Sequence, residues 1–471
     1  MAENPLNALA MMYISTRGVA PKLDFKGALM AGLASDGGLY VPESMPSFSP
    51  SHIASLAGLS YSDLALEIMM PFVGDSFSRA EMKRMIDTAY ANFRHAAIAP
   101  LTQLSANHFV LELFHGPTLA FKDFALQLVG QLLEATMKDS GKRAVVLGAT
   151  SGDTGSAAMA GCMNRANLDI VILYPHGRTS DVQRRQMTTL GAKNIHALAV
   201  DGTFDDCQDM VKTLFADGDF RANTQLLAVN SINFARVLAQ IVYYFYAALR
   251  LGAPSAKLNF TVPTGNFGDI YAGYLARCMG LPIHKLVIAS NENNILARCV
   301  KTGEYRMNGV KPTHSPSMDI EISSNFERLL FDLFDRDGAA LGKAMTEFRA
   351  TKSLTLTPAQ HADFIRLFAA GTVDDAGTLA CISRTYAENG YVLDPHTAVG
   401  VATTQALDLQ GINITLATAH PAKFPEAVKT ATGATPALPA HLADLFEREE
   451  QFTPMTRDLD ALKAYIMSLP Q

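Results

Sequence analysis

A single lysine, Lys122, lies among leucine, phenylalanine and alanine in the stretch LFHGPTLAFKDFALQ at residues 113–127. Burying an ammonium group is costly and lowers the pKa of the lysine. Such a lysine is therefore either a surface residue whose stem covers apolar neighbours, or an amine used in chemistry as a Schiff-base former or a base. The stretch alone leaves both alternatives open.

The first of three candidate ligand loops is GATSGDTGS at residues 148–156, between an apolar run and a small-residue helical pattern. Its glycines let the backbone approach a ligand, and its hydroxyls and the helix N-terminus can bind an anion. It has neither the Gly-Lys-Ser/Thr of a P-loop nor the dinucleotide GxGxxG. The alternative is a tight capped turn. The candidate donors are the hydroxyls of Ser151, Thr154 and Ser156.

The second candidate loop lies in LNFTVPTGNFGDIYAGYLARCMG at residues 258–280. Consecutive backbone N–H groups at the start of a helix form a nest for phosphate, which the helix dipole favours. The alternative is again a capped turn. The candidate nest residues are Gly265, Asn266, Phe267, Gly268 and Asp269.

The third candidate loop ends the strand-like run in INITLATAHPAKF at residues 412–424. The hydroxyl of Thr418 at a strand end can meet a ring nitrogen without placing a charge beside it. The alternative is a threonine that caps a helix starting near Pro421.

Polar residues also open a strongly apolar helix in AVNSINFARVLAQ at residues 228–240. Arg236 follows Asn233 by one helical turn, so both could face one ligand, and an arginine can grip a phosphate with two hydrogen bonds. The alternative is an Asn/Ser cap and a surface arginine. The candidate residues are Asn230, Ser231, Asn233 and Arg236.

These loops follow short β-branched runs that alternate with helical patterns from about residue 143. Such alternation predicts an α/β fold with parallel sheets covered by helices, and ligands then bind at the carboxyl ends of the strands. We expect an N-terminal α/β domain over 1–100, a core over 101–430 with a smaller subdomain at about 140–225, and a helical C-terminal segment over 431–471. After about residue 340 we expect only one further strand, at 412–417.

Composition excludes several classes of function. The 471 residues carry a net charge of −6, so no basic field would attract nucleic acid. Five cysteines without a CxxC pair are typical of a cytosolic thiol protein. The start of the chain lacks the basic region of a signal peptide, no apolar run is long enough to span a membrane, and no HExxH-type spacing predicts a metal. We therefore expect a cytoplasmic protein.

An ordered set of motifs resembles the long form of the threonine synthase family, pyridoxal 5'-phosphate (PLP) enzymes of fold type II (tryptophan synthase β-like). The set extends over nearly the whole chain and includes YISTRG, GLASDGGLYVPE, HGPTLAFKDFALQ, GATSGDTGSAA, NSINFAR, VPTGNFGDIYAGY, SPSMDIEISSNFERLL, DPHTAVG and LATAHPAKF. The loop SGDTG alone is weakly specific, because related dehydratases have similar loops. The whole set in this order is highly specific.

The resemblance implies a role for each candidate residue. Lys122 would hold the cofactor aldehyde as a Schiff base and then transfer protons, and Thr418 would meet the pyridine nitrogen. The nest at 265–269 would bind the cofactor phosphate. Ser151, Gly152, Asp153 and Thr154 would bind the substrate carboxylate and flank the ring. The polar residues at 230–236 would contact the substrate phosphate.

The implied reaction is a lyase step of threonine biosynthesis, in which O-phospho-L-homoserine and water give L-threonine and phosphate. A phospho-lyase or a serine/threonine dehydratase on the same scaffold is the first alternative, since it would share the lysine and the nest. A catalytically inactive relative is the second, and a metal hydrolase is the weakest because paired ligand spacing is missing.

Overall fold

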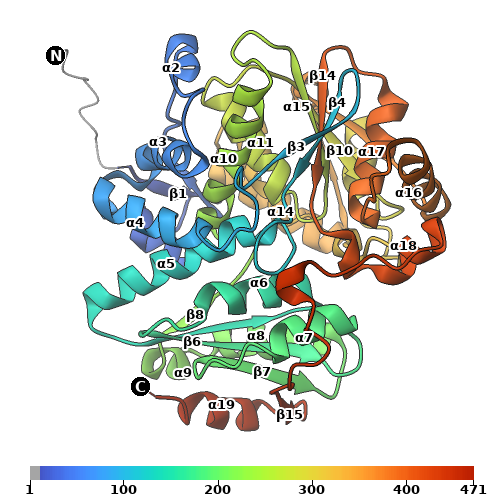
Figure 1. Ribbon diagram of the computed structural model, residues 1–471. Helices are drawn as coiled ribbons and strands as arrows, with labels where there is room; N and C mark the ends of the chain where they lie inside the picture. The colour runs from blue at the N-terminus through green and yellow to red at the C-terminus, as the bar shows by residue number, and fades with distance from the viewer. Residues whose placement is uncertain (1–10, 471) are drawn as a thin grey trace.

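The computed structural model describes residues 11–470, which form two main parallel-rich sheets, one above the other in Figure 1. Residues 1–10, part of the stretch in which we expect no signal peptide, and residue 471 lie outside the described residues. The larger sheet has six strands in the order β13-β10-β9-β14-β4-β3. Its strands are β3 (Leu101–Ser105), β4 (His108–Glu112), β9 (Leu258–Pro263), β10 (Ile283–Ser290), β13 (Phe368–Thr372) and β14 (Ile412–Ala417).

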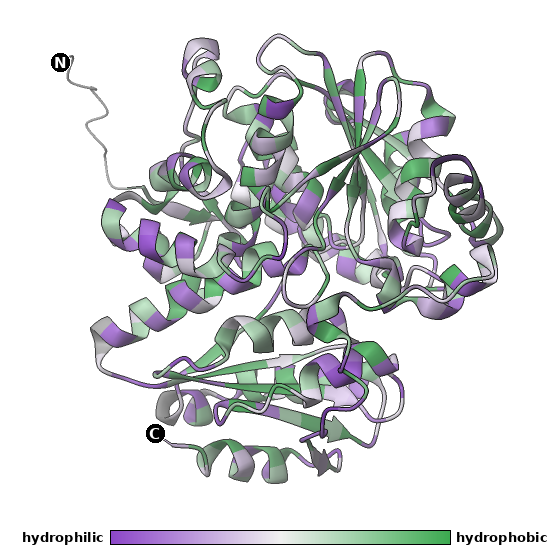
Figure 2. Ribbon diagram, viewed as in Figure 1, coloured by the Kyte–Doolittle hydropathy of each residue, from purple (hydrophilic) through white to green (hydrophobic). Residues whose placement is uncertain are grey.

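All neighbouring pairs in the larger sheet are parallel except β3 and β4, which form an antiparallel hairpin at one edge. Helix α17 (Pro395–Leu407), with α16 (Asp375–Asn389) outside it, covers one face of the sheet, and α11 (Gly268–Cys278) lies on the other. The central strands are buried on both faces, as expected of parallel sheets. Figure 2 shows the strands of this sheet mostly in the hydrophobic colour.

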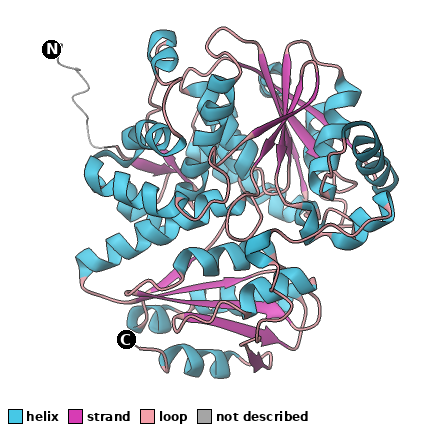
Figure 3. Cartoon of the chain, viewed as in Figure 1, coloured by secondary structure: helices cyan, strands magenta, loops and turns pink. Residues whose placement is uncertain are grey.

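The smaller sheet has five parallel strands in the order β15-β7-β6-β5-β8. Helices α6 and α7 pack on the face toward the larger body, whereas α8 and α19 cover the opposite face (Figures 1 and 3). The elements are β5 (Ala144–Ala149), β6 (Leu168–Pro175), β7 (Ile195–Val200), β8 (Leu226–Ala228), β15 (Thr453–Met455), α6 (Asp153–Cys162), α7 (Asp181–Thr188), α8 (Phe204–Ala216), α9 (Gly218–Asn223) and α19 (Leu459–Met467).

The N-terminal region packs directly on the larger body and shares its hydrophobic core. The ring of Tyr13 lies 5.1 Å from that of Phe234 at the start of helix α10 (Phe234–Arg250). Tyr61 lies 5.2 Å from Tyr246 of the same helix. The region comprises β1 (Tyr13–Ser15), β2 (Tyr40–Pro42), α1 (Phe25–Ala31), α2 (Pro50–Ser55), α3 (Tyr61–Val73), η1 (Gly74–Ser76) and α4 (Arg79–Tyr90).

The remaining elements connect the two bodies or cover the larger sheet. Helix α5 (Lys122–Ser140) runs from the larger body to the smaller one in Figure 1. The others are α12 (Ile295–Thr302), β11 (Glu304–Arg306), η2 (Pro316–Met318), α13 (Phe326–Leu333), α14 (Gly338–Thr351), β12 (Ser353–Thr355), α15 (Pro358–Leu367), η3 (Pro421–Lys423), α18 (Pro425–Thr432) and η4 (Ala440–Leu442).

The structure confirms the predicted strands and helices between residues 143 and 303 and the strand at 412–417. The expectation of one further strand after about residue 340 is wrong, because β12, β13 and β15 also form. These strands have three to five residues and lie at sheet edges, where partial burial removes the continuous apolar signal. The C-terminal segment is not only helical, since β15 extends the smaller sheet. The domain boundaries at 100 and 430 stay predictions.

Helices α5 and α6 cross at two glycines that let their backbones touch. A Cβ atom on Gly161 would lie 2.2 Å from the Leu126 carbonyl oxygen, and one on Gly130 would lie 2.1 Å from the Gly161 carbonyl oxygen. Lys122 is the first residue of α5 and Asp153 the first of α6. The crossing therefore fixes how these two helix starts face each other.

We predict that Gly161→Ala lowers the free energy of unfolding by about 1–3 kcal/mol or more, because the helices must separate to admit a methyl group. Urea denaturation measures the change. Gly218→Ala is the matched control, since Gly218 also lies in a helix of the smaller body but has no atom within 4 Å of the added Cβ. An equal effect of both changes would contradict the proposed crossing constraint.

Candidate active site

A cavity lies where the larger sheet faces the smaller body. It is placed at the carboxyl ends of β9 and β14, where parallel sheets bind ligands. Seventeen residues line it. They are Phe121, Lys122, Thr154, Ser231, Arg236, Gln240, Pro263, Thr264, Gly265, Asn266, Phe267, Gly268, Asp269, Ser317, Met318, His396 and Thr418.

Lys122 faces this cavity, and its side chain is only 13% exposed. The segment before it is bound to the end of β14, because the Phe121 N–H donates to the Thr418 carbonyl oxygen at 2.9 Å and Ala120 forms a bridge with Ala419. These contacts direct the lysine away from bulk solvent. The surface alternative is therefore wrong for Lys122.

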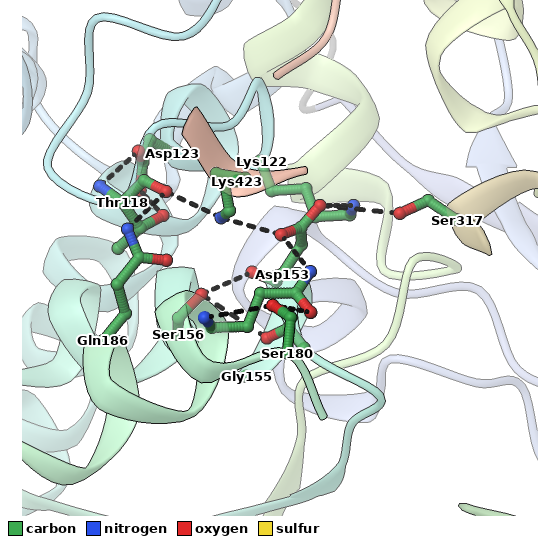
Figure 4. A network of polar contacts seen from close by, with 12 residues as sticks. Thr118, Lys122, Asp123, Asp153, Gly155, Ser156, Ser180, Gln186, Ser317 and Lys423 are labelled. Carbon is green, nitrogen blue, oxygen red and sulfur yellow. Dashed lines mark hydrogen bonds and ion pairs between the residues drawn. The ribbon is translucent and has the colours of Figure 1, made fainter. Parts of the chain in front are cut away.

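The Asp153 carboxylate lies between two ammonium groups (Figure 4). Its Oδ2 is 3.3 Å from Lys122 Nζ, and its Oδ1 is 2.7 Å from Lys423 Nζ. Gln183 also donates to Oδ1 at 2.8 Å. Although burial alone raises the pKa of Asp153, the two ammonium groups and this hydrogen bond hold it well below its usual range.

Burial lowers the pKa of Lys122. The nearby cations of Lys423 and Arg236 lower it further, and Asp153 opposes them. The net shift favours the neutral amine, which is the form that attacks a carbonyl carbon or accepts a proton.

The position of Asp153 does not favour the expected role, which is to bind the substrate carboxylate. Both of its oxygens are bound to cations, and an ionised carboxylate repels a substrate carboxylate. The Gly152 N–H donates to the Thr150 hydroxyl at 3.0 Å, and Ser151 is exposed outside the cavity lining. Of the predicted loop 151–154, only Thr154 lines the cavity.

The loop at 265–269 has the form of an anion nest. Phe267 has a φ of 65°, a left-handed conformation that turns the backbone into helix α11. Among residues 11–470, no group accepts a hydrogen bond from the N–H groups of these five residues. The unpaired donors at a helix N-terminus fit a phosphate group, such as that of PLP.

Carbonyl groups of this loop accept hydrogen bonds from side chains that follow η2. Ser323 Oγ donates to the Gly265 carbonyl at 2.7 Å. The Asn325 side chain donates to the carbonyls of Asn266 and Ser231 at 3.1 and 3.2 Å. Arg328, which is fully buried, donates to Asn325 Oδ1 and to the Tyr40 carbonyl. The N-terminal region is thereby linked to the nest.

Asp269 belongs to the nest by its backbone, but its carboxyl group points into the core. Tyr243 and Tyr244 donate hydrogen bonds to Oδ1, and Oδ2 is buried without a partner within the described chain. Burial raises the pKa of Asp269 to about 7, despite the opposing effect of the tyrosines. A carboxyl group that is largely protonated below neutral pH does not repel a phosphate at the nest.

Arg236 is buried and lines the cavity, and its Nη1 has no hydrogen-bond partner among residues 11–470. Burial lowers the pKa of Arg236 to about 10, which leaves the guanidinium charged at neutral pH. An unpaired buried guanidinium is costly, so this atom is positioned to bind an anion in the cavity. Ser231 and Gln240 line the same part of the wall.

The expectation that Asn233 faces a ligand beside Arg236 is wrong. The Asn233 side chain accepts from the Ala235 N–H at 3.1 Å and donates to the Leu29 carbonyl at 2.8 Å, so it caps α10 and contacts the N-terminal region. Asn230 is exposed and does not line the cavity.

Thr418 lines the cavity at the end of β14, as expected for a residue that meets a ring. Its N–H donates to the Thr397 hydroxyl at 3.3 Å, and Asp394 accepts from Thr397 and from His396 Nδ1. His396 Nε2 accepts from the Ser317 N–H at 3.1 Å. The start of α17 thus supports two walls of the cavity.

The sequence did not assign Lys423, Ser317, Gln240 or Asn325 to the site, whereas His396 was a candidate for the site wall through the matched motif DPHTAVG. Lys423 lies in the matched motif HPAKF, and Ser317 and Asn325 lie in SPSMDIEISSNFERLL. Within residues 11–470, no cluster of three or more His, Cys, Asp or Glu side chains could hold a metal, and no helix is long and apolar enough to cross a membrane.

We predict that Asp269→Asn gains stability relative to the parent protein as the pH rises from about 5.5 to 8.5. Asp269 binds its proton more tightly in the folded protein, with a pKa of about 7, than in the unfolded chain, where the usual value is 3.8. Between these two pKa values the folded state binds more protons than the unfolded chain, so the free energy of unfolding falls as the pH rises. Asparagine does not titrate, so the variant does not lose this stability.

Thermal unfolding of both proteins across this pH range measures the difference. A melting-temperature difference that does not change with pH would show that Asp269 is ionised throughout.

Comparisons with known proteins agree with the geometry. Family models match residues 12–90 ("Threonine synthase N terminus"), 94–413 ("Pyridoxal-phosphate dependent enzyme") and 397–466 ("Threonine synthase, C-terminal"). Among relatives, threonine synthase of Pseudomonas aeruginosa is 54% identical over 459 residues, covering 97% of this chain and 98% of that protein.

Two solved structures are similar over almost the whole chain. PLP-bound threonine synthase from Brucella melitensis has a TM-score of 0.95 at 50% identity, covering 97% of this chain and 98% of that one. Threonine synthase from yeast has a TM-score of 0.93 at 39% identity, covering 98% of each chain.

Proposed function

The chain belongs to the threonine synthase family of PLP-dependent fold-type II enzymes, and from this premise we propose how its residues convert O-phospho-L-homoserine and water to L-threonine and phosphate. One observation carries the assignment of roles. A single cavity holds a buried lysine, Lys122, together with two separate sets of unpaired anion donors, at residues 265–269 and at Arg236. A cofactor and a substrate that each carry a phosphate need such a cavity.

Lys122 is the residue that links to the cofactor aldehyde and later moves protons on the substrate. Its side chain reaches the cavity, and burial favours its neutral form. Lys423 is also close, but its side chain is 0% exposed and does not line the cavity. The distinction between these two lysines supports Lys122 as the reacting amine.

The nest at 265–269 binds the cofactor phosphate through backbone N–H groups, and the Thr418 hydroxyl meets the pyridine nitrogen. When bound, PLP supplies an electron-withdrawing ring that stabilises negative charge on carbon atoms of the substrate. Thr154, which lines the same cavity, would lie beside the ring and contact the substrate carboxylate.

Arg236 binds the phosphate of the substrate, assisted by Ser231 and Gln240. The guanidinium orients this group for departure from the γ carbon, which needs the loss of two protons, one that Lys122 removes from the carbon next to the amine nitrogen and a second from the β carbon. Water then adds at the β carbon, and reprotonation gives threonine. The walls formed by Ser317, Met318 and His396 limit the water that can reach the reacting carbons, since stray water would divert the reaction.

We also propose a cytoplasmic location and a monomeric or homodimeric state. The division into an N-terminal domain over 1–100, a core over 101–430 with a subdomain at about 140–225, and a C-terminal segment over 431–471 belongs to the same proposal. Two family-model matches, which end at residue 90 and begin at residue 94, support a boundary near residue 90.

We predict that Lys122→Ala abolishes the visible absorbance of the purified protein, because the covalent link to the cofactor is lost. Absorbance spectra of the variant and the parent protein, recorded with added PLP after gel filtration, measure the link. Lys285→Ala is the control, since Lys285 lies at the surface and donates only to backbone carbonyls. A covalent cofactor band that persists in Lys122→Ala would exclude this assignment.

We predict that Arg236→Met raises the KM for O-phospho-L-homoserine by about 10- to 100-fold, since a hydrogen bond to a charged group contributes about 1.5–3 kcal/mol. Inhibition by inorganic phosphate should weaken in parallel. Arg250→Met is the matched control at the other end of α10, where the arginine donates to the Ala57 and Leu59 carbonyls. Unchanged phosphate inhibition in Arg236→Met would place the substrate phosphate elsewhere.

A product assay tests the proposed function directly. The purified protein is incubated with PLP and O-phospho-L-homoserine, and threonine, 2-oxobutyrate and phosphate are quantified. Threonine equal to phosphate is the expected result. Phosphate with 2-oxobutyrate and no threonine would identify a phospho-lyase, and no phosphate would reject the substrate.

A further inference from the structure

Lys423 is a buried lysine that the proposed mechanism does not use as a reacting group. Its side chain is 0% exposed, and its Nζ lies 2.7 Å from Asp153 Oδ1. The same Nζ donates to the Thr118 carbonyl oxygen at 2.7 Å. A fully buried ammonium group is costly to retain, so its partners indicate what it does.

Lys423 lies between its two partners, Thr118 and Asp153, and Lys122 lies on the Asp153 side (Figure 4). Thr118 belongs to the turn just before Lys122, and its N–H and hydroxyl both bind the carboxyl group of Asp123 at 2.8 Å. Asp153, at the start of α6, faces Lys122 directly. One ammonium group therefore holds the turn that carries the reacting lysine and the carboxylate that faces it.

The charges explain why two lysines share one carboxylate. If Lys122 were the only partner of Asp153, the loss of its proton would leave a buried carboxylate without a counter-ion. With Lys423 in place, the proton leaves Lys122 and the group of three changes from a net charge of +1 to 0. The Asp153–Lys423 pair then remains neutral as a unit.

We propose that Lys423 is a positioning residue of the catalytic site, whose fixed ammonium keeps Asp153 paired so that Lys122 can lose its proton and react as a neutral amine. The inference rests on the proposed function, in which Lys122 is the reacting amine. The charged groups that face Lys122 are Asp153 from α6, Lys423 from η3 and Arg236 from α10. The effects of these groups on the pKa of Lys122 agree with the geometry, because burial and both cations lower this pKa and only Asp153 raises it.

The test measures the protonation of Lys122 without using catalytic turnover. The full-length chain is freed of cofactor by dialysis against a carbonyl-scavenging amine and is then mixed with PLP in a stopped-flow instrument between pH 6 and 10. The rate at which the visible band appears reports the fraction of neutral Lys122 amine. The midpoint of the pH profile is compared between variants, so that the titration of PLP itself cancels.

Lys423→Met should move this midpoint upward by about 1 pH unit or more, because Lys122 loses a repulsive neighbour and becomes the only counter-ion of Asp153. At a fixed pH below the midpoint, the rate should fall about tenfold for each unit. Lys463→Met is the matched control, since Lys463 pairs with Asp217 in the smaller body at 2.6 Å and does not line the cavity. An unchanged midpoint in Lys423→Met would overturn the proposal.

The double variant Asp153→Asn/Lys423→Met distinguishes electrostatics from structural damage. With the carboxylate and its partner both removed, burial and Arg236 alone act on Lys122, so the midpoint should return to the parent value or below it. Structural damage would instead displace the double variant at least as far as Lys423→Met. A raised midpoint in the double variant would therefore reject the proposed role.

If Lys423→Met does not fold, Lys423→Arg and the double variant still test the proposed role of Lys423. The arginine keeps the charge and should leave the midpoint at the parent value, and a midpoint raised in either variant would contradict the proposal. Failure of the proposed function gives a different result, since the parent protein would then form no band that depends on Lys122. A band that requires Lys122 but does not respond to Lys423 rejects only the role of Lys423.

Discussion

The buried carboxylate of Asp153, held between the ammonium groups of Lys122 and Lys423, is the interaction on which the site depends. Asp153 belongs to the smaller body, whereas both lysines belong to the larger one. An unpaired buried charge costs several kcal/mol, so the two bodies are held in an arrangement that keeps all three groups together. The glycine crossing of α5 and α6 supplies the matching steric constraint, because these helices begin at Lys122 and Asp153.

The two anion-binding parts of the cavity have different chemistry for a physical reason. Backbone N–H groups at 265–269 carry no net charge, and the nearby Asp269 is kept largely protonated below neutral pH by burial. The nest can therefore hold a permanent phosphate without further cations. Arg236 is a full positive charge with a free donor atom, which suits a phosphate that must be bound, released and replaced. The buried contacts of Asn325 and Arg328 connect the nest and the segment at Ser231 to the N-terminal region.

The sequence predicts well what depends on neighbouring residues. The continuous apolar runs of β5, β6, β9 and β14 were recognisable because both faces of these strands are buried, and the nest was recognisable because its residues are consecutive. Edge strands such as β13 and β15 lack this pattern. The pairing of Asp153 with Lys423, and the use of Asn233 as a cap that contacts Leu29, depend on contacts between distant segments. Patterns in one sequence contain no information on such contacts. The sequence therefore did not predict that Asp153 is paired with two lysines.

The central claim is that, of two buried lysines on one carboxylate, Lys122 carries the cofactor. The most direct measurement is to reduce the PLP-loaded protein with borohydride, digest it and locate the pyridoxyl group by mass spectrometry. We expect the modification on Lys122, because its side chain lines the cavity and that of Lys423 does not. A modification on Lys423 or on another lysine, with Lys122 unmodified, would contradict it.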